Sequence, residues 1–148
     1  MRYALRPNVM EGVATHMPFY WAATSFEGRR VIGYLHDLDK EPYIEGGAIP
    51  DVINLEEAEI ILASDLQQSY TQLKVSLGLA RVTNIDESAL HAMVLLNFVD
   101  GWESFKENID FIIAMGNRDY KKAEEVLGNP PVISELIHDL LRSAQNGD

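Results

Sequence analysis

The residues of this chain that could do chemistry are mainly carboxylates. Its 148 residues include 23 Asp and Glu, four His and no Cys. The absence of Cys excludes disulfides, thiolate zinc sites and Cys nucleophiles together. The sequence also has no Gly-rich phosphate loop, no Ser nucleophile elbow and no His-Glu-x-x-His zinc helix. What is left to this chain is the chemistry of carboxyl and imidazole groups.

The four histidines do not form one motif, because His16, His36, His91 and His138 are widely spread. The last two fall inside expected helices, where we interpret them as partly buried structural residues. The run from His36 to Asp39, which reads His-Asp-Leu-Asp, could in principle hold a metal ion. We interpret it as a solvated acidic loop, and the sequence predicts no metal site.

The charge balance disfavours several classes of partner. Twelve Lys and Arg against 23 Asp and Glu give a net charge of -11. A nucleic-acid interface needs a basic stripe, so we expect no nucleic-acid partner. The same charge repels anionic membranes and cell-wall polyanions, an effect that salt screens beyond about 10 Å.

No stretch of the sequence has the pattern of a targeting or membrane-spanning segment. The start, Met-Arg-Tyr-Ala-Leu-Arg-Pro, lacks the apolar run of a signal peptide. The longest apolar runs, such as residues 92–96, are far shorter than the roughly 20 residues that span a bilayer. We therefore expect synthesis in the cytoplasm, no stable membrane insertion, and action on a cell wall only after release by another agent.

Before Asn54 the pattern is that of short strands and turns. Gly and Pro residues separate runs rich in aromatic and β-branched residues, and strands are expected at residues 19–21, 30–32 and 42–44. Glu27 and Gly28 are placed to form a tight hairpin turn, for which Gly supplies the positive φ. A short helix is expected to open at Pro7 and to end near Glu11.

After Asn54 the apolar residues follow the 3.6-residue period of helices. Asn54 and Glu57 form a capping-box pattern ahead of a long helix over residues 55 to about 79. Asn84 and Glu87 repeat that pattern before the next helix. The shorter helices that we expect after the long one cover residues 89–98, 103–114, 119–127 and 132–143.

These patterns predict an α+β fold that is mainly helical. We expect a single domain over residues 1–148, with a small lobe that holds a short antiparallel β-hairpin sheet, a long bridging helix and a helical second lobe. The expected bounds are about 12–53, about 54–79 and about 80–148, and an N-terminal helix of residues 1–11 joins the helical lobe.

The order of several short motifs is similar to that of a known enzyme family. The segments that carry the likeness are 11–12 (Glu-Gly), the hairpin 25–36, 53–59 (Ile-Asn-Leu-Glu-Glu-Ala-Glu) with Asp65 beyond it, and 95–98 (Leu-Leu-Asn-Phe). This order resembles the phage-type lysozymes, glycoside hydrolase family 24, over roughly residues 5–127. The resemblance implies a lysozyme-like fold and weakens over the last helix.

The chemistry that the resemblance implies is that of an inverting glycosidase without a cofactor. Such an enzyme uses a Glu as general acid and, about 6.5–9.5 Å away, a carboxylate base that activates water. In the family this base is an Asp, and a Thr lies beside the water. Glu11 matches the acid, whereas Ser25 falls at the Asp position and Val31 at the Thr position. Neither replacement can do the chemistry of the residue it replaces.

A replacement base must come from elsewhere if this chain hydrolyses glycans. The carboxylates available in the small lobe are Glu27, Asp37, Asp39 and Glu41. We expect Glu27 first, because it lies on the same hairpin as the family's base, and a strand that stays regular would point Ser25 and Glu27 to the same side. About five extra residues between Glu11 and the hairpin could shift the hairpin to suit.

Further positions carry over binding or structural roles. In the resembling family the residues that match His36 and Asp65 form an ion pair between the hairpin and the long helix, so we predict a structural tie here. The predicted substrate-binding positions are Ser25, Val31, Tyr20, Trp21 and Asn97. The two aromatic residues in this set could stack on sugar rings or pack in the core.

Two functions from different classes follow. The first is a muramidase-type glycoside hydrolase, such as a phage endolysin, that cleaves the glycan strand of bacterial peptidoglycan with Glu11 and Glu27 as catalytic residues. The alternative is a catalytically silent module that keeps the scaffold and binds a glycan or a protein partner. The lost Asp and Thr positions and the acidic surface favour the alternative, whereas Glu11 and the motif order favour the enzyme. Neither function implies a cofactor.

Overall fold

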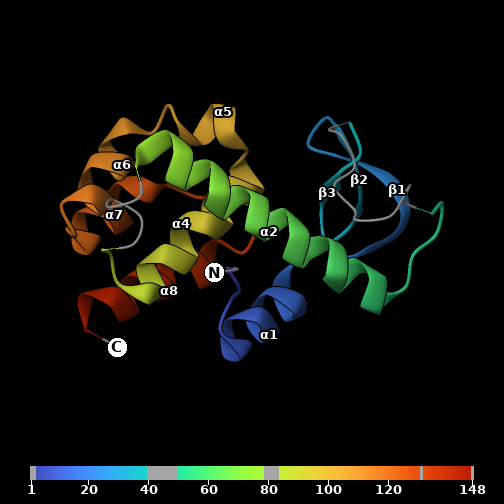
Figure 1. Ribbon diagram of the computed structural model, residues 1–148, viewed down its shortest axis with the longest axis horizontal. Helices are drawn as coiled ribbons and strands as arrows, with labels where there is room; N and C mark the ends of the chain where they lie inside the picture. The colour runs from blue at the N-terminus through green and yellow to red at the C-terminus, as the bar shows by residue number, and fades with distance from the viewer. Residues whose placement is uncertain (1–2, 40–49, 79–83, 131, 148) are drawn as a thin grey trace. The chain divides into compact units, whose positions relative to one another are not determined.

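The computed structural model of the chain describes residues 3–39, 50–78, 84–130 and 132–147. These residues are mainly helical, with one three-stranded antiparallel sheet, so the predicted α+β class is confirmed. The chain forms two compact units, Met1–Gln68 and Ser69–Asp148, which are called the first and the second unit below. One helix, α2 (Leu55–Leu77), runs unbroken from the first into the second (Figure 1). The prediction that both form a single domain stays a prediction.

The first unit opens with helix α1 (Pro7–His16). Pro7 fits the first turn, where its missing N–H would have had no helical partner. The prediction that a helix opens at Pro7 is confirmed, so the broader bounds of residues 1–11 are wrong at the start, where residues 3–6 are not helical. The predicted end near Glu11 is also wrong, because α1 continues five residues past it. Nothing in the sequence breaks the helix before Met17, which is extended because Pro18 follows it.

The sheet consists of β1 (Tyr20–Phe26), β2 (Arg29–Gly33) and β3 (His36–Asp37), paired in chain order. Glu27 and Gly28 form the two-residue turn between β1 and β2, with φ of 51° and 77°. Positive φ at both turn residues gives a twist that matches the strands. The predicted hairpin turn is therefore confirmed.

Strand β1 is longer than the predicted strand and irregular in its first half. Between its pairs with Gly33 and Val31, β1 advances four residues, from Tyr20 to Thr24, while β2 advances two. Two extra residues of β1 therefore bulge out of the ladder. The strand predicted at 42–44 lies outside the described residues.

Helix α2 is capped as the sequence predicts. The Asn54 side-chain oxygen accepts from the backbone N–H of Glu57 at 2.8 Å, and the backbone N–H of Asn54 donates to the Glu57 carboxylate at 3.1 Å. The helix then continues for 23 residues without a break, so the predicted unbroken helix is confirmed. It ends at Leu77, slightly before the predicted end near residue 79. Neither α2 nor any other helix in the described parts of the chain is long and apolar enough to cross a membrane.

The end of β2 lies very close to the start of α2. Gly33 has a φ of 62°, and a Cβ at this residue would lie 2.9 Å from Ile53 Cδ1 and 3.2 Å from Ala58 Cβ. Glycine alone tolerates both the left-handed backbone and this close approach. Gly33 therefore lets the sheet pack tightly against the beginning of the long helix.

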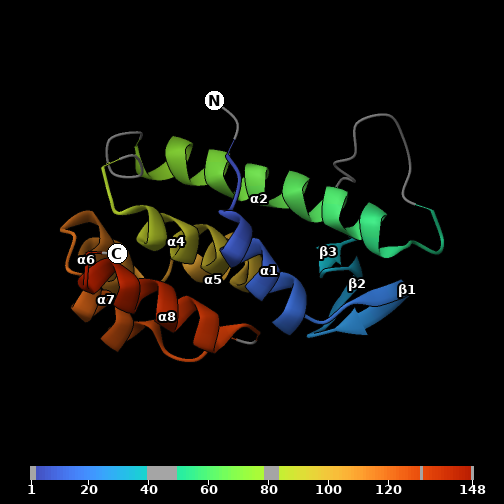
Figure 2. The same cartoon turned by 90° about the horizontal axis from the view of Figure 1, so that it is seen from below.

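The second unit contains the end of α2 and a group of shorter helices. These are α4 (Glu87–Asp100), α5 (Trp102–Phe105), α6 (Ile109–Gly116), α7 (Tyr120–Leu127) and α8 (Ser134–Gln145). Helix α4 packs against α5 and α8, and α7 packs against α6 and α8 (Figure 2). The rings of Phe105 and Phe111 are fully buried and meet edge to face.

Two sequence predictions for the second unit are wrong in detail. The helix predicted at 103–114 is two helices, because Asn108 leaves helical geometry and its side-chain oxygen accepts from the N–H of Phe111 at 3.3 Å. The cap predicted at Asn84 is instead Asp86, whose carboxylate accepts from the N–H of Ser88 at 2.8 Å. In both places a side chain other than the expected one caps the start of the helix.

Candidate functional site

The two predicted catalytic carboxylates, Glu11 and Glu27, both belong to the first unit. Glu11 lies in the middle of α1 and is exposed, on the face opposite the buried Val9 and Val13. Glu27 is exposed in the turn between β1 and β2. Both carboxylates are therefore open to solvent, and their catalytic roles stay predictions.

Glu27 does not continue the side-chain alternation of β1. The strand ends at Phe26, and Glu27 takes up a left-handed conformation with a φ of 51°. The expectation that Ser25 and Glu27 face the same side assumes a strand that stays regular up to the turn, and the pairing is regular from Thr24 to Phe26. Glu27 itself lies in the turn, so the direction of its side chain stays a prediction.

Ser25 and Val31 lie in the regular half of the hairpin. Ser25 pairs with Arg30, and Thr24 pairs with Val31. The two extra residues of β1 lie before Thr24, so the pairing is regular at both positions. That Ser25 and Val31 correspond to the Asp and Thr of the resembling family stays a prediction. Ser25 is exposed and carries no carboxylate, whereas Val31 is 0% exposed and carries no hydroxyl.

Two of the other candidate carboxylates pair with arginines of β2. Arg29 Nη1 lies 4.0 Å from Asp37 Oδ2, and Arg30 Nε lies 3.5 Å from Asp39 Oδ1. Asp39 also accepts a hydrogen bond from the backbone N–H of Arg30 at 3.4 Å. Arg30 and Asp39 are exposed, and a pair of this kind contributes about 0–1 kcal/mol, whereas Arg29 and Asp37 are partly buried. Both carboxylates are thus paired with side chains of β2. Glu41, the remaining candidate, lies outside the described residues.

The predicted tie between His36 and Asp65 is present in the first unit. His36 Nδ1 lies 2.8 Å from Asp65 Oδ2 and 3.0 Å from Oδ1. The two side chains are 5% and 9% exposed, so the contact is shielded from water. It joins β3 to α2, and the other ring nitrogen, Nε2, is buried with no hydrogen-bond partner in the described part of the chain. This geometry fits a structural role for the pair.

The two predicted stacking residues have different surroundings. Tyr20 is half-buried, with its ring 6.4 Å from that of Phe26. Trp21 is 58% exposed, so it does not pack in the core. Of the two, only Trp21 presents most of its ring surface to solvent.

Asn97, the remaining predicted binding residue, is buried in the second unit at 3% exposure. Its Nδ2 donates to Ser69 Oγ at 2.9 Å and to Gln72 Oε1 at 3.2 Å, and Ser69 Oγ donates to the Val94 carbonyl at 2.8 Å. These bonds join α4 to the end of α2. Asn97 is thus held by structural contacts, and it shares no unit with the other predicted site residues.

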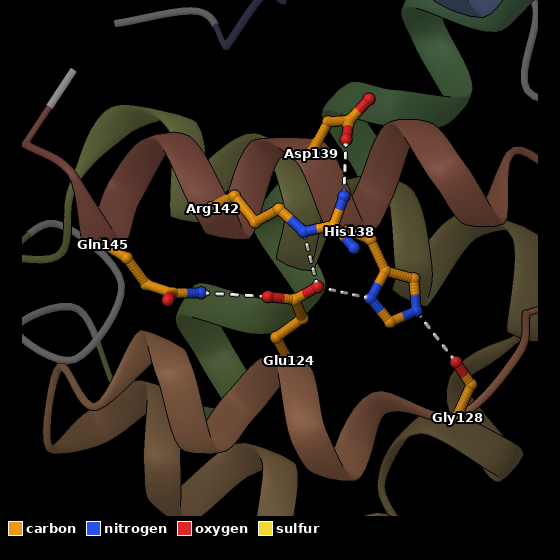
Figure 3. Close-up of polar contacts among 6 residues, drawn as sticks. All are labelled: Glu124, Gly128, His138, Asp139, Arg142 and Gln145. Atoms are coloured by element: carbon orange, nitrogen blue, oxygen red, sulfur yellow. Dashed lines mark hydrogen bonds and ion pairs between the residues drawn. The ribbon is translucent and has the colours of Figure 1, made fainter.

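A polar cluster between α7 and α8 was not found by sequence reasoning (Figure 3). Glu124 of α7 accepts from three side chains of α8, namely His138 Nδ1 at 3.1 Å, Arg142 Nε at 2.9 Å and Gln145 Nε2 at 3.0 Å. The other ring nitrogen of His138 lies 3.0 Å from the carbonyl oxygen of Gly128, which ends α7. The spacing of the three donors, on one face of a helix, was the available signal.

The same cluster shifts the titration of its central carboxylate. Burial raises the pKa of Glu124, but hydrogen bonds from Gln145 and His138, together with the charge of Arg142, outweigh it, so the pKa is lowered. Charge-assisted donors favour the ionised carboxylate. The cluster is a structural clasp between two helices of the second unit.

The fold built from these elements is lysozyme-like, as the sequence predicts. Among solved structures, the chain is similar to the muramidase domain of SpmX from Asticaccaulis excentricus, with a TM-score of 0.62 and 18% sequence identity. The match covers 98% of this chain and 97% of that chain. No protein-family model matches the chain, and no curated protein matches it in sequence. A likeness at this identity shows the fold, and the function has to be argued from the site.

Proposed function

We propose that this chain binds the glycan strand of bacterial peptidoglycan and does not hydrolyse it. The ligand class is supported by the lysozyme-like fold and by its likeness to a muramidase domain. The loss of hydrolysis is supported by the regular pairing of the hairpin from Thr24 to Val31. That pairing is the observation that carries the proposal, because no bulge shifts the register between Thr24 and Arg29. With this register, the resemblance implies that Ser25 and Val31 occupy the positions where an inverting enzyme of this type needs its base and its water ligand.

The chemistry of these two positions explains why hydrolysis would fail. An inverting glycosidase needs a carboxylate that takes a proton from the attacking water. The hydroxyl of Ser25 cannot serve as that base, and the buried Val31 cannot hydrogen-bond a water. Glu11 could still act as a proton donor, but protonation of the glycosidic oxygen alone does not supply the activated water.

Hydrolysis is the second candidate, and the exposure of Glu11 and Glu27 in the same unit favours it. In this mechanism Glu11 gives its proton to the glycosidic oxygen as the bond to the anomeric carbon breaks. Glu27 takes a proton from the water whose oxygen attacks that carbon from the opposite face. The chain would then be a muramidase of the endolysin type.

A binding assay and a cleavage assay on the same material separate the two candidates. Purified peptidoglycan sacculi are incubated with the protein, sedimented, and assayed for new reducing ends from about pH 4 to 8, a range that covers carboxylate acid–base pairs. We expect the protein to sediment with the sacculi and to release no reducing ends. Release that disappears in Glu11→Gln would overturn the proposal in favour of hydrolysis. A folded protein that neither sediments nor cleaves would contradict both candidates.

Restoring the missing groups gives a sharper test. The double variant Ser25→Asp with Val31→Thr rebuilds the family pattern, and Ser25→Asn with Val31→Thr is its matched control without a carboxylate. We expect reducing-end release only from the variant with Asp. The buried threonine hydroxyl costs about 1–3 kcal/mol in both variants, so their stability is compared first by urea unfolding. Equal release from the parent and the Asp variant would contradict the proposal.

A further inference from the structure

Trp21 is displayed by the irregular half of β1. It follows Tyr20 directly in the stretch where β1 carries two residues more than β2. The indole is 58% exposed, and the next two residues, Ala22 and Ala23, are exposed but too small to cover it. The bulge therefore presents a flat aromatic surface to solvent.

The indole packs against another ring on one side. The Phe19 ring meets it edge to face, with centroids 4.7 Å apart, and lies 5.3 Å from the ring of Tyr34. Tyr34 is only 3% exposed, so this chain of rings is anchored in the core. The backbone is fixed as well, because the Trp21 carbonyl accepts from the N–H of Ile53 at 2.9 Å.

We infer that Trp21 is a stacking platform for a pyranose ring of a glycan strand. This inference rests on the proposed function and names a contact that the ligand would make. The C–H face of a pyranose is apolar and flat, and it matches the face of an indole. A side chain that is already ordered loses little conformational freedom on binding.

Charge and sequence position both support this occupant. Stacking on an uncharged ring needs no positive charge, so it suits a chain of net charge -11 that faces an anionic wall polymer. Trp21 also lies in the stretch between Glu11 and the hairpin that is longer here than in the resembling family. The platform is therefore a feature of this chain and does not follow from the family pattern.

The test uses a soluble probe, the hexasaccharide of β-1,4-linked N-acetylglucosamine. The chain has only two tryptophans, Trp21 and Trp102, so Trp102→Phe leaves Trp21 as the single fluorescent reporter. We expect the probe to change the emission of Trp102→Phe, and calorimetry to show that Trp21→Ala binds the probe roughly three- to tenfold more weakly than the parent. Ile60→Ala is the matched control, because Ile60 is 61% exposed in the same unit and should keep the parent affinity.

The outcomes separate this inference from the proposed function. Equal affinity of Trp21→Ala and the parent for both the probe and the sacculi would overturn the stacking role and leave glycan binding intact. A parent that binds neither the probe nor the sacculi would overturn both. Because Trp21 is exposed, its variant should keep the parent's urea unfolding midpoint, which shows that any lost binding is local.

Discussion

Each unit of this protein joins two of its elements through a histidine and a carboxylate, but the two contacts are built differently. In the first unit, His36 and Asp65 are 5% and 9% exposed, and His36 uses only one ring nitrogen. In the second unit, His138 and Glu124 are 20% and 19% exposed, and both ring nitrogens of His138 have acceptors. Glu124 also accepts from two further side chains of α8.

The difference teaches how burial sets the cost of losing a partner. Water does not readily replace a lost group beside a buried carboxylate, so removing its imidazole partner is costly. In a partly exposed cluster with several donors, the other donors and water fill the gap. We therefore expect one substitution at the contact in the first unit to cause a large loss in the free energy of unfolding. One substitution in the cluster of the second unit should cause only a small loss.

The largest effect should come from His36→Ala. It leaves the Asp65 carboxylate buried without its imidazole partner, and we expect a loss of about 3–5 kcal/mol in the free energy of unfolding. Urea unfolding at pH 7 measures it, and Arg142→Ala in the second unit, with a loss of about 1 kcal/mol or less, is the matched comparison. The double variant His36→Leu with Asp65→Leu should recover much of the loss. Equal losses in His36→Ala and Arg142→Ala would remove the distinction between the two contacts.

A second comparison uses two glycines with positive φ, one beside each contact. Gly33 has Ile53 Cδ1 at 2.9 Å from its hypothetical Cβ, whereas Gly128 has nothing within 4 Å. Gly128→Ala should cost about 1–3 kcal/mol through backbone strain alone, because its φ of 74° and ψ of -147° lie in a region that is essentially restricted to glycine. Gly33→Ala also has a positive φ and adds overpacking against the start of α2, a further cost of about 1–3 kcal/mol, so its total loss should be the larger. Both are measured by urea unfolding, and equal costs would show that the close approach at Gly33 contributes nothing.

The pH dependence of Glu124→Gln should sharpen the description of the second cluster. The pKa of Glu124 is lowered in the folded protein, so its stabilising effect is fully present above the ordinary Glu pKa and is lost as the pH falls through the lowered pKa. We expect the variant to be less stable than the parent by about 1 kcal/mol at neutral pH, with the difference shrinking in acid. Urea unfolding at a series of pH values tests this. A difference that stays constant with pH would contradict the assignment of the clasp to the ionised carboxylate.

The smallest effect should be a gain in stability from Glu27→Asn. Glu27 adopts a φ of 51° ahead of Gly28, and Asn-Gly is the preferred pair for this hairpin turn. We expect a gain of about 0.5 kcal/mol in the free energy of unfolding. The same variant removes the candidate base, so any glycan cleavage that falls while stability rises would assign a catalytic role to Glu27. Unchanged cleavage would exclude that role.

Much of the local structure could be predicted from the sequence. The turn at Glu27 and Gly28, the capping box of Asn54 and Glu57, and the unbroken length of α2 each depend on residues within a few positions of one another. Hydrogen bonds of this range are made by the backbone and its neighbouring side chains, so they are encoded locally. The contact of His36 with Asp65 was found in another way, through the resemblance to a family.

Tertiary structure alone decided several features that the sequence could not predict. These features are the burial of Val31, the bulge that displays Trp21, and the clasp at Glu124. Each depends on contacts between residues that are far apart in the sequence. Periodicity shows which side of an element is apolar, but not which partner covers it or where a strand gains two residues. The sequence by itself determined most of the elements and the lysozyme-like order of motifs, and through the resemblance it implied the loss of a carboxylate at Ser25. Only packing decided which of the remaining side chains are buried supports and which face solvent, because burial is a property of the whole fold.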